Sequence, residues 1–119
     1  MPGADPKRGD IYNVMPHVVL SGDAHAGPRR MVCVAERPTE YVWTAMSRTT
    51  TAEDEAADLF SPADESLGLT KDGWWSYRYL RSVKKRWTGD PHQCPFLASM
   101  PEPLKAEVLA HYMSRPGPS

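Results

Sequence analysis

The segment from Gly73 to Val83 constrains the fold most, because it is the clearest strand signal in the sequence. Aromatic and branched side chains dominate it, and such side chains favour β-structure. Gly89-Asp90-Pro91 follows as a turn that ends the extended chain. One face of this strand is expected to form core, because successive side chains of a strand point to opposite faces. The signal is carried by Trp74, Trp75, Tyr77, Tyr79, Leu80 and Val83.

Shorter strands are predicted before this segment, with glycine- or proline-containing turns between them. The acidic stretch Ala52–Leu59 is predicted to form one or two helical turns capped by Thr51, and Ser61–Gly68 is predicted to be a polar loop. The predicted strands are Asp10–Val14, Arg30–Ala35 and Tyr41–Ser47, and His17–Leu20 extends the first of them or begins a flap.

The C-terminal segment has helical rather than alternating spacing. Ser99-Met100-Pro101-Glu102 has the pattern of a capping box with an early proline, which a helix start tolerates. Several strands followed by one helix, without regular βα alternation, predict a mainly β fold of the α+β type: a small antiparallel barrel or curled sheet with the helix packed on it. The apolar residues at helical spacing are Leu104, Val108, Leu109, Tyr112 and Met113, whereas Lys105, Glu107 and His111 are expected to face away.

The length of 119 residues suits a single domain, in which residues 1–7 and 115–119 are expected to be flexible. No apolar run approaches the ~20 residues that span a bilayer, and the N-terminus has no signal-peptide core. We therefore expect a cytoplasmic protein that does not contact a membrane. Cys33 and Cys94 require no disulfide. A zinc site is discounted because the sequence has no C-x-x-C pair, so no metal or cofactor is expected.

Several segments, in their order and spacing, resemble the MazF/PemK family of toxin ribonucleases. The resemblance covers most of residues 7–87 and implies one domain over 1–119 with a small SH3-like, CcdB-type antiparallel barrel and a C-terminal helix. The matching segments are Arg8-Gly9-Asp10-Ile11-Tyr12 (the family's RGDVY or RGDIW strand), Gly27-Pro28-Arg29-Arg30-Met31-Val32-Cys33-Val34 (its G-x-R-P-V-V-I-I strand), Ala45-Met46-Ser47-Arg48 (its I-T-S-R segment), and Lys71-Asp72-Gly73 through Lys85 (its KDS…QIRTIDK strand).

The resemblance implies a growth-inhibitory toxin that cleaves single-stranded RNA without a metal, acts as a homodimer and is neutralised by an antitoxin. Arg29 matches the family's catalytic arginine and is suited to stabilising the phosphorane-like transition state, because its planar fork can hold two phosphate oxygens. Ser47 can donate a hydrogen bond to phosphate, and Thr49 is a candidate for the same role. His25, in the loop that covers the family's active site, is the candidate acid or base.

A basic, aromatic stretch is the candidate RNA-binding surface, although the net charge of the chain is only −1. Rings can stack on bases while cations contact the backbone of a single strand. Alternation along residues 74–81 is expected to put Trp75, Tyr77, Tyr79 and Arg81 on one face. The alternative is a core strand that ends in a solvated basic turn. The predicted RNA-binding residues are Arg30, Arg48, Trp75, Tyr77, Arg81, Lys84, Lys85 and Arg86.

Departures from the family pattern leave the enzymatic activity open. Arg30 stands where the family has proline, Met46 replaces the threonine associated with cleavage, Tyr79 replaces a glutamine and Lys84 replaces an aspartate. Two other functions therefore remain. One is a catalytically degenerate barrel that inhibits by binding a host protein, as the related CcdB toxins poison a topoisomerase. The other is a nucleic-acid-binding module without catalysis.

Overall fold

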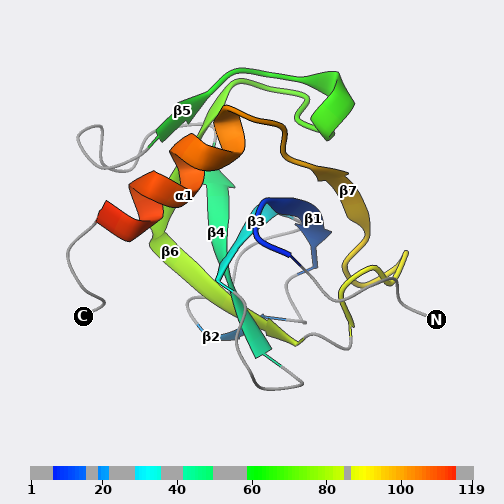
Figure 1. The fold of residues 1–119 in the computed structure, drawn as a ribbon. Coiled ribbons are helices and arrows are strands. Elements are labelled where there is room, and N and C mark those ends of the chain that lie inside the picture. The colour runs from blue at the N-terminus through cyan, green and yellow to red at the C-terminus, as the bar shows by residue number, and fades with distance from the viewer. Residues whose placement is uncertain are drawn as a thin grey trace.

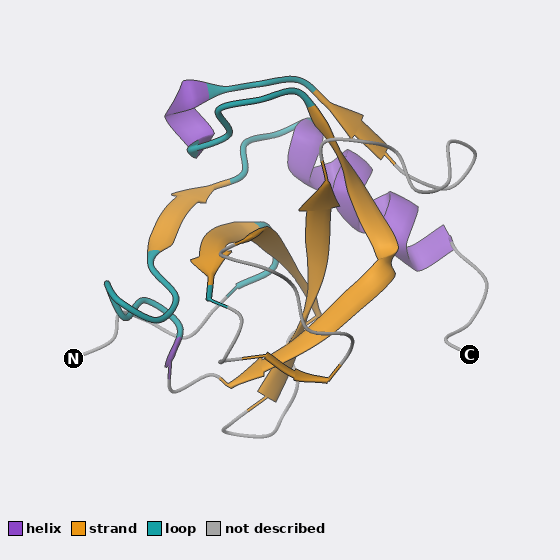
Figure 2. Ribbon diagram, turned by 180° about the vertical axis from the view of Figure 1, so that it is seen from behind, coloured by secondary structure: helices purple, strands orange, loops and turns teal. Residues whose placement is uncertain are grey.

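The protein is built around one antiparallel sheet of seven strands (Figure 1). The structure is a computed structural model, and it describes residues 7–15, 19–21, 29–35, 42–49, 59–84 and 87–114. The strands pair in the order β2-β6-β4-β3-β1-β7, and β5 pairs with the other half of β6 (Figure 2). The elements are β1 (Asp10–Val14), β2 (Val19–Ser21), β3 (Arg29–Ala35), β4 (Val42–Thr49), β5 (Leu59–Ser61), the 3-10 helix η2 (Glu65–Leu67), β6 (Gly73–Lys84), β7 (Phe96–Ser99) and α1 (Leu104–Ser114).

The prediction of an antiparallel, mainly β fold with a C-terminal helix is confirmed. Among the described residues the sheet is open, because β2 and β7 stand at the two ends of the strand order without pairing to each other. Two predictions for the middle of the chain need correction. Leu59 begins β5 rather than ending a helix, and the segment predicted as the loop Ser61–Gly68 contains the end of β5 and helix η2. Residues 51–58, where the helical turns were predicted, lie outside the described residues.

The predicted capping box is wrong in its first member. Ser99 ends strand β7, and its hydroxyl donates to the Asp10 carboxylate over 3.0 Å instead of capping a helix. Helix α1 begins later, at Leu104. The Glu102 carboxylate caps it from just outside, accepting the backbone N–H of Ala106 over 2.9 Å. A side chain is needed there because the first N–H groups of a helix have no partner within it.

The Arg8-Gly9-Asp10 motif forms a structural turn that leads into β1. Gly9 has φ = +94°, a conformation that favours glycine. Its N–H donates to the Cys33 carbonyl, and its own carbonyl accepts the N–H of Met100, both over 2.9 Å. Asp10 closes the turn by accepting the N–H of Lys7 on its carboxylate over 3.0 Å. The turn thus connects the start of the chain to β3 and to the segment that leads into α1.

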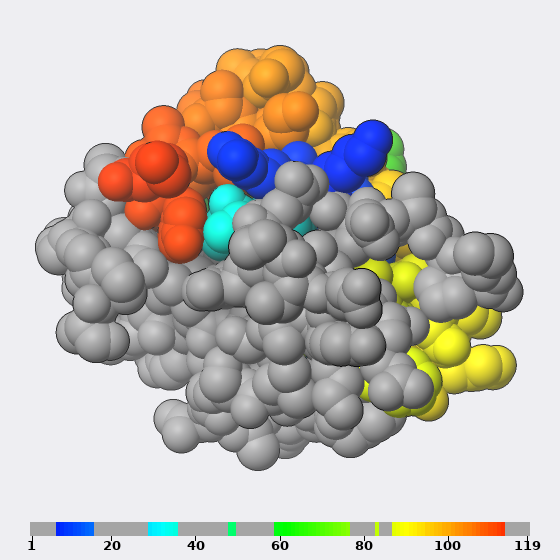
Figure 3. All heavy atoms as spheres, turned by 60° about the horizontal axis from the view of Figure 1, so that its bottom comes forward, coloured from blue at the N-terminus to red at the C-terminus, as the bar shows by residue number. Residues whose placement is uncertain are grey.

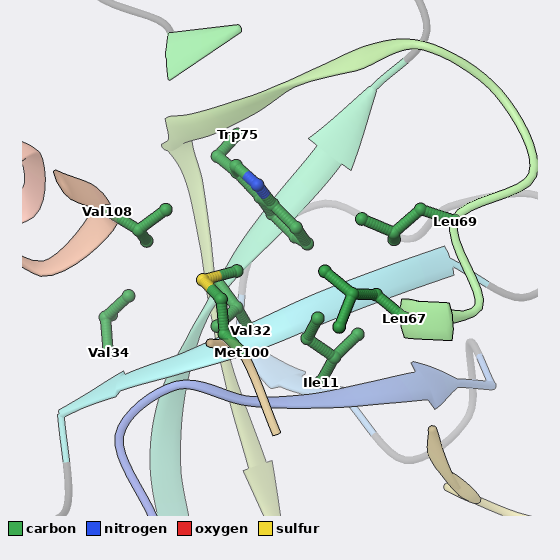
Figure 4. Packing of buried hydrophobic residues seen from close by; sticks show 8 residues of the cluster. All are labelled: Ile11, Val32, Val34, Leu67, Leu69, Trp75, Met100 and Val108. Atoms are coloured by element: carbon green, nitrogen blue, oxygen red, sulfur yellow. The ribbon is translucent and has the colours of Figure 1, made fainter. Parts of the chain in front are cut away.

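The two faces of the sheet each carry a core. The helix-side core lies under α1 and η2, and in Figure 4 the Trp75 ring lies within it, between Val108 and Leu69. The opposite core lies on the other face of the sheet. Neighbouring residues of a strand point to opposite faces, so Ile11 belongs to the helix-side core and Tyr12 to the opposite core. The helix-side core contains Ile11, Val32, Val34, Leu67, Leu69, Trp75, Met100 and Val108, and the opposite core contains Tyr12, Val14, Met31, Cys33, Val83 and Cys94.

Helix α1 packs on the sheet through part of its predicted apolar face. Val108 is fully buried, and Leu104, Leu109 and Tyr112 are partly buried against the helix-side core. Met113 is 73% exposed and does not belong to this face, contrary to the prediction. In Figure 3, residues 7–15 border α1, and part of β3 reaches the surface between them. No helix in the described ranges is both long and apolar enough to cross a membrane.

Candidate functional site

The register of the sheet brings three of the predicted catalytic positions to one end. Strand β3 begins at Arg29 and the antiparallel β4 ends at Thr49, while Ser47 pairs with Met31. Continuing this register two residues toward the strand ends puts Thr49 opposite Arg29. Residues far apart in the sequence therefore meet at this end because the strands run antiparallel. The fourth predicted catalytic residue, His25, lies outside the described residues, and so does the side chain of Ser47.

Arg29 lies on the face of the opposite core, directly across from the buried Val14 of β1. Its side chain is half-buried, and within the described part of the chain it makes no hydrogen bond or ion pair. Its guanidinium is therefore not committed to a structural contact among these residues. Thr49 is buried, with 7% of its surface exposed. This end of the sheet thus places a half-buried cation opposite a buried threonine, and the planar fork of the arginine is suited to a phosphate group.

Three predicted RNA-binding residues lie on the other face of the sheet. Trp75 is fully buried in the helix-side core, so its ring offers no surface to a base in this structure. Arg48 pairs with Trp75 across the strands, and its guanidinium carbon lies 5.6 Å from the centre of that ring. Arg30 is half-buried and donates from Nε to the Gly68 carbonyl over 3.2 Å. The structure therefore places these three residues in packing and loop anchoring.

Arg48 anchors the connection between β5 and β6 through hydrogen bonds to its backbone carbonyl groups. Its Nη1 donates to the Lys71 carbonyl over 2.8 Å, and its Nη2 donates to the Ser61 carbonyl over 2.5 Å. Burial lowers the pKa of Arg48, whereas neighbouring Asp72 raises it, and the guanidinium keeps its charge because an arginine pKa lies so far above neutral pH. Gly73 makes room for it, since a Cβ there would lie 2.8 Å from Nη1 and 2.5 Å from the Thr49 carbonyl oxygen.

The predicted alternation along β6 is interrupted. Ser47 pairs with Ser76 and Ala45 pairs with Arg81, so two steps along β4 correspond to five along β6. An odd number of residues on one strand against an even number on the other reverses the faces. Positions 75 and 81 therefore lie on opposite faces of the sheet, not on one. The side chains of Tyr77, Tyr79, Arg81 and Lys84 are outside the described part, as are residues Lys85 and Arg86 altogether.

Sequence reasoning missed an aromatic pair beside this end of the sheet. Phe60 pairs with Trp74, and their ring centres are 5.2 Å apart in an edge-to-face arrangement with an interplanar angle of 66°. Phe60 is 49% exposed, and Trp74 is half-buried and pairs with Thr49. Trp74 belongs to the predicted strand from Gly73 to Val83. No sequence pattern pointed to Phe60, because its pairing with Trp74 depends on strand β5, which was not predicted.

The described residues contain no group of three or more His, Cys, Asp or Glu side chains arranged to hold a metal ion. Cys33 and Cys94 are buried thiols of the opposite core and form no disulfide with each other. Burial raises the pKa of Cys94 to about 12, although the nearby N–H of Gly89 opposes this rise. Thiolate chemistry at neutral pH is therefore disfavoured at Cys94.

Comparison with protein-family models, with curated proteins and with solved structures found no match to this chain.

Proposed function

We propose that this protein is a toxin of the MazF/PemK kind, a metal-independent endoribonuclease that cleaves single-stranded RNA. In this proposal the antiparallel sheet is the main part of a small SH3-like, CcdB-type barrel, the active form is a homodimer, and an antitoxin neutralises it. The observation that carries the proposal is the β3–β4 register, in which Met31 pairs with Ser47; continued by two residues, it puts Thr49 opposite Arg29 at one end of the two strands.

The chemistry asks for positive charge on the phosphate and for groups that move protons. The ribose 2′-OH attacks phosphorus, the bond from phosphorus to the 5′-oxygen breaks, and the products are a 2′,3′-cyclic phosphate and a 5′-OH. The Arg29 fork would hold two non-bridging oxygens as charge builds on them. Thr49 or Ser47 would donate a hydrogen bond to the same phosphate. His25 remains the candidate for proton transfer.

The first prediction tests Arg29 with purified protein and a single-stranded RNA of mixed sequence in the presence of a chelator. We expect the wild type to cleave the RNA and Arg29→Gln to cleave it about a hundredfold more slowly, because a donor aimed at the developing charge is lost. Arg8→Gln is the matched control, since Arg8 is an exposed arginine of the N-terminal turn. RNA that stays intact in an excess of the wild-type protein would exclude the ribonuclease.

One observation favours the alternative of a toxin that acts by binding a host protein. Arg30, Arg48 and Trp75 take part in packing, which leaves fewer groups for RNA than the sequence predicted. Growth measurements separate the two functions. A ribonuclease loses its toxicity in the Arg29→Gln variant, whereas a binding toxin without catalysis inhibits growth as strongly with that substitution, provided that Arg29 lies outside its binding surface.

A further inference from the structure

We propose that Phe60 and Trp74 form a stacking platform for one base of single-stranded RNA, next to the phosphate that Arg29 binds. This inference rests on the proposed function, because it takes RNA as the ligand. Its starting point is the aromatic pair itself. The two rings meet edge to face across β5 and β6, and Phe60 keeps 49% of its surface exposed.

The rings belong to the same row of the sheet as Arg29. Phe60 pairs with Trp74, Trp74 pairs with Thr49, and the continued β3–β4 register puts Thr49 opposite Arg29. Side chains at directly paired positions lie on the same face of a sheet. Neighbouring strands are ~4.8 Å apart, so Arg29 and Trp74 are separated by about 10 Å at the backbone. That spacing lets one nucleotide reach from the cation to the rings.

The aromatic pair lies apart from both cores of the described part of the chain. Leu59 and Trp75, the chain neighbours of the two rings, face the helix-side core, so Phe60 and Trp74 face the other way. Among the described residues, neither ring belongs to the helix-side core or to the opposite core. Solvent-accessible aromatic rings in line with a cation combine the two features that hold single-stranded nucleic acid: π-faces for bases and positive charge for the backbone.

Two variants and a modified RNA test the platform. We expect Phe60→Ala to weaken the binding of a single-stranded RNA by about tenfold, the size of effect that stacking on one ring produces. Phe60→Trp should retain the affinity. Phe96→Ala is the matched control, because Phe96 is also 49% exposed and also meets a ring edge to face, that of Tyr12 at 5.6 Å. It should bind like the wild type.

An abasic scan identifies the stacked base. Removing single bases along the RNA should weaken wild-type binding at one position near the cleaved bond, and Phe60→Ala should abolish that positional effect. Salt dependence separates the rings from the cation. Arg29→Gln should lower the slope of log affinity against log salt by about 0.7, one phosphate contact on a single strand, whereas Phe60→Ala should leave the slope unchanged.

The outcomes distinguish this inference from the proposed function. If the wild type cleaves RNA but Phe60→Ala binds as tightly as Phe96→Ala, the platform is overturned and the ribonuclease stands. If RNA binding depends on Phe60 but the wild type never cleaves, the platform stands and the ribonuclease is excluded. If the wild type binds no RNA, both are overturned.

Discussion

At the scale of single residues, neighbouring arginines have unlike roles because a strand alternates its faces. Arg29 and Arg30 are adjacent at the start of β3, yet Arg29 lies across from Val14 and Arg30 lies across from Asn13. Arg30 is therefore directed toward Gly68 above the helix-side core, while Arg29 stays available on the other face. The register position of each arginine, not its residue type, decides whether it is engaged in a structural contact here.

Arg48 allows a direct test of a structural arginine. We expect Arg48→Met to lower the free energy of unfolding by about 3 kcal/mol, because the buried Ser61 carbonyl and the partly buried Lys71 carbonyl lose their charged donor. Arg48→Lys should restore only part of the loss, since an ammonium lacks the planar fork. Urea unfolding measures both changes.

The control for this measurement is Lys71→Met, because Lys71 is exposed and offers only its backbone carbonyl to Arg48. Its expected effect is within about 0.5 kcal/mol. An Arg48→Met variant as stable as that control would mean that the guanidinium does not hold the loop, and Arg48 would return to the candidate RNA-binding residues.

At the scale of elements, the strands that carry the site are held by partners distant in the sequence. Strand β6 pairs with β4 along one edge, and with β5 and β2 along the two halves of the other edge. The shift in register along β6 reverses its faces midway, so Trp75 is in the helix-side core and Val83 is in the opposite core. One long strand therefore serves both cores.

Helix α1 offers the matched pair for a prediction at this scale. Val108→Ala should lower the free energy of unfolding by about 2 kcal/mol, because Val108 is fully buried and its loss leaves a cavity under the helix. Met113→Ala should change it by less than about 0.5 kcal/mol, since Met113 is 73% exposed. Equal effects in chemical denaturation would mean that the helix packs through a different face.

At the scale of the whole molecule, the two cores share one sheet and cannot be separated. Ile11 and Tyr12 are consecutive in β1 and belong to different cores, and so do Val32 and Cys33 in β3. Any opening that removes β1 or β3 exposes both. We therefore expect the two cores to unfold in one cooperative transition.

Two probes check this cooperativity. Far-ultraviolet circular dichroism follows the backbone, and the reaction of Cys33 and Cys94 with a thiol reagent at pH 8 follows the opposite core, because both thiols are buried and burial raises the pKa of Cys94 to about 12. The two denaturation curves should coincide. Thiol labelling well before the loss of circular dichroism would mean that the opposite core opens independently.

The sequence predicted the elements whose signals are local. The limits of β1 match the prediction, β3 and β6 each differ from theirs by one residue at one end, and β4 differs by one residue at its start and two at its end. Strands β5 and β7 were not predicted, because short strands of three and four residues take their stability from partners rather than from their own composition. The catalytic candidates Arg29, Ser47 and Thr49 came from motif resemblance, and Phe60 could not be found that way.

The sequence by itself therefore determined that strands come first and a helix last, because side-chain periodicity and turn residues act within a few positions. Only the tertiary structure decided which arginines are anchors, which rings are core, and that Phe60 and Trp74 share a row with Thr49. The reason is physical. Which face a residue occupies depends on the register between strands, and one shift between Ala45 and Ser47 was enough to reverse it along β6.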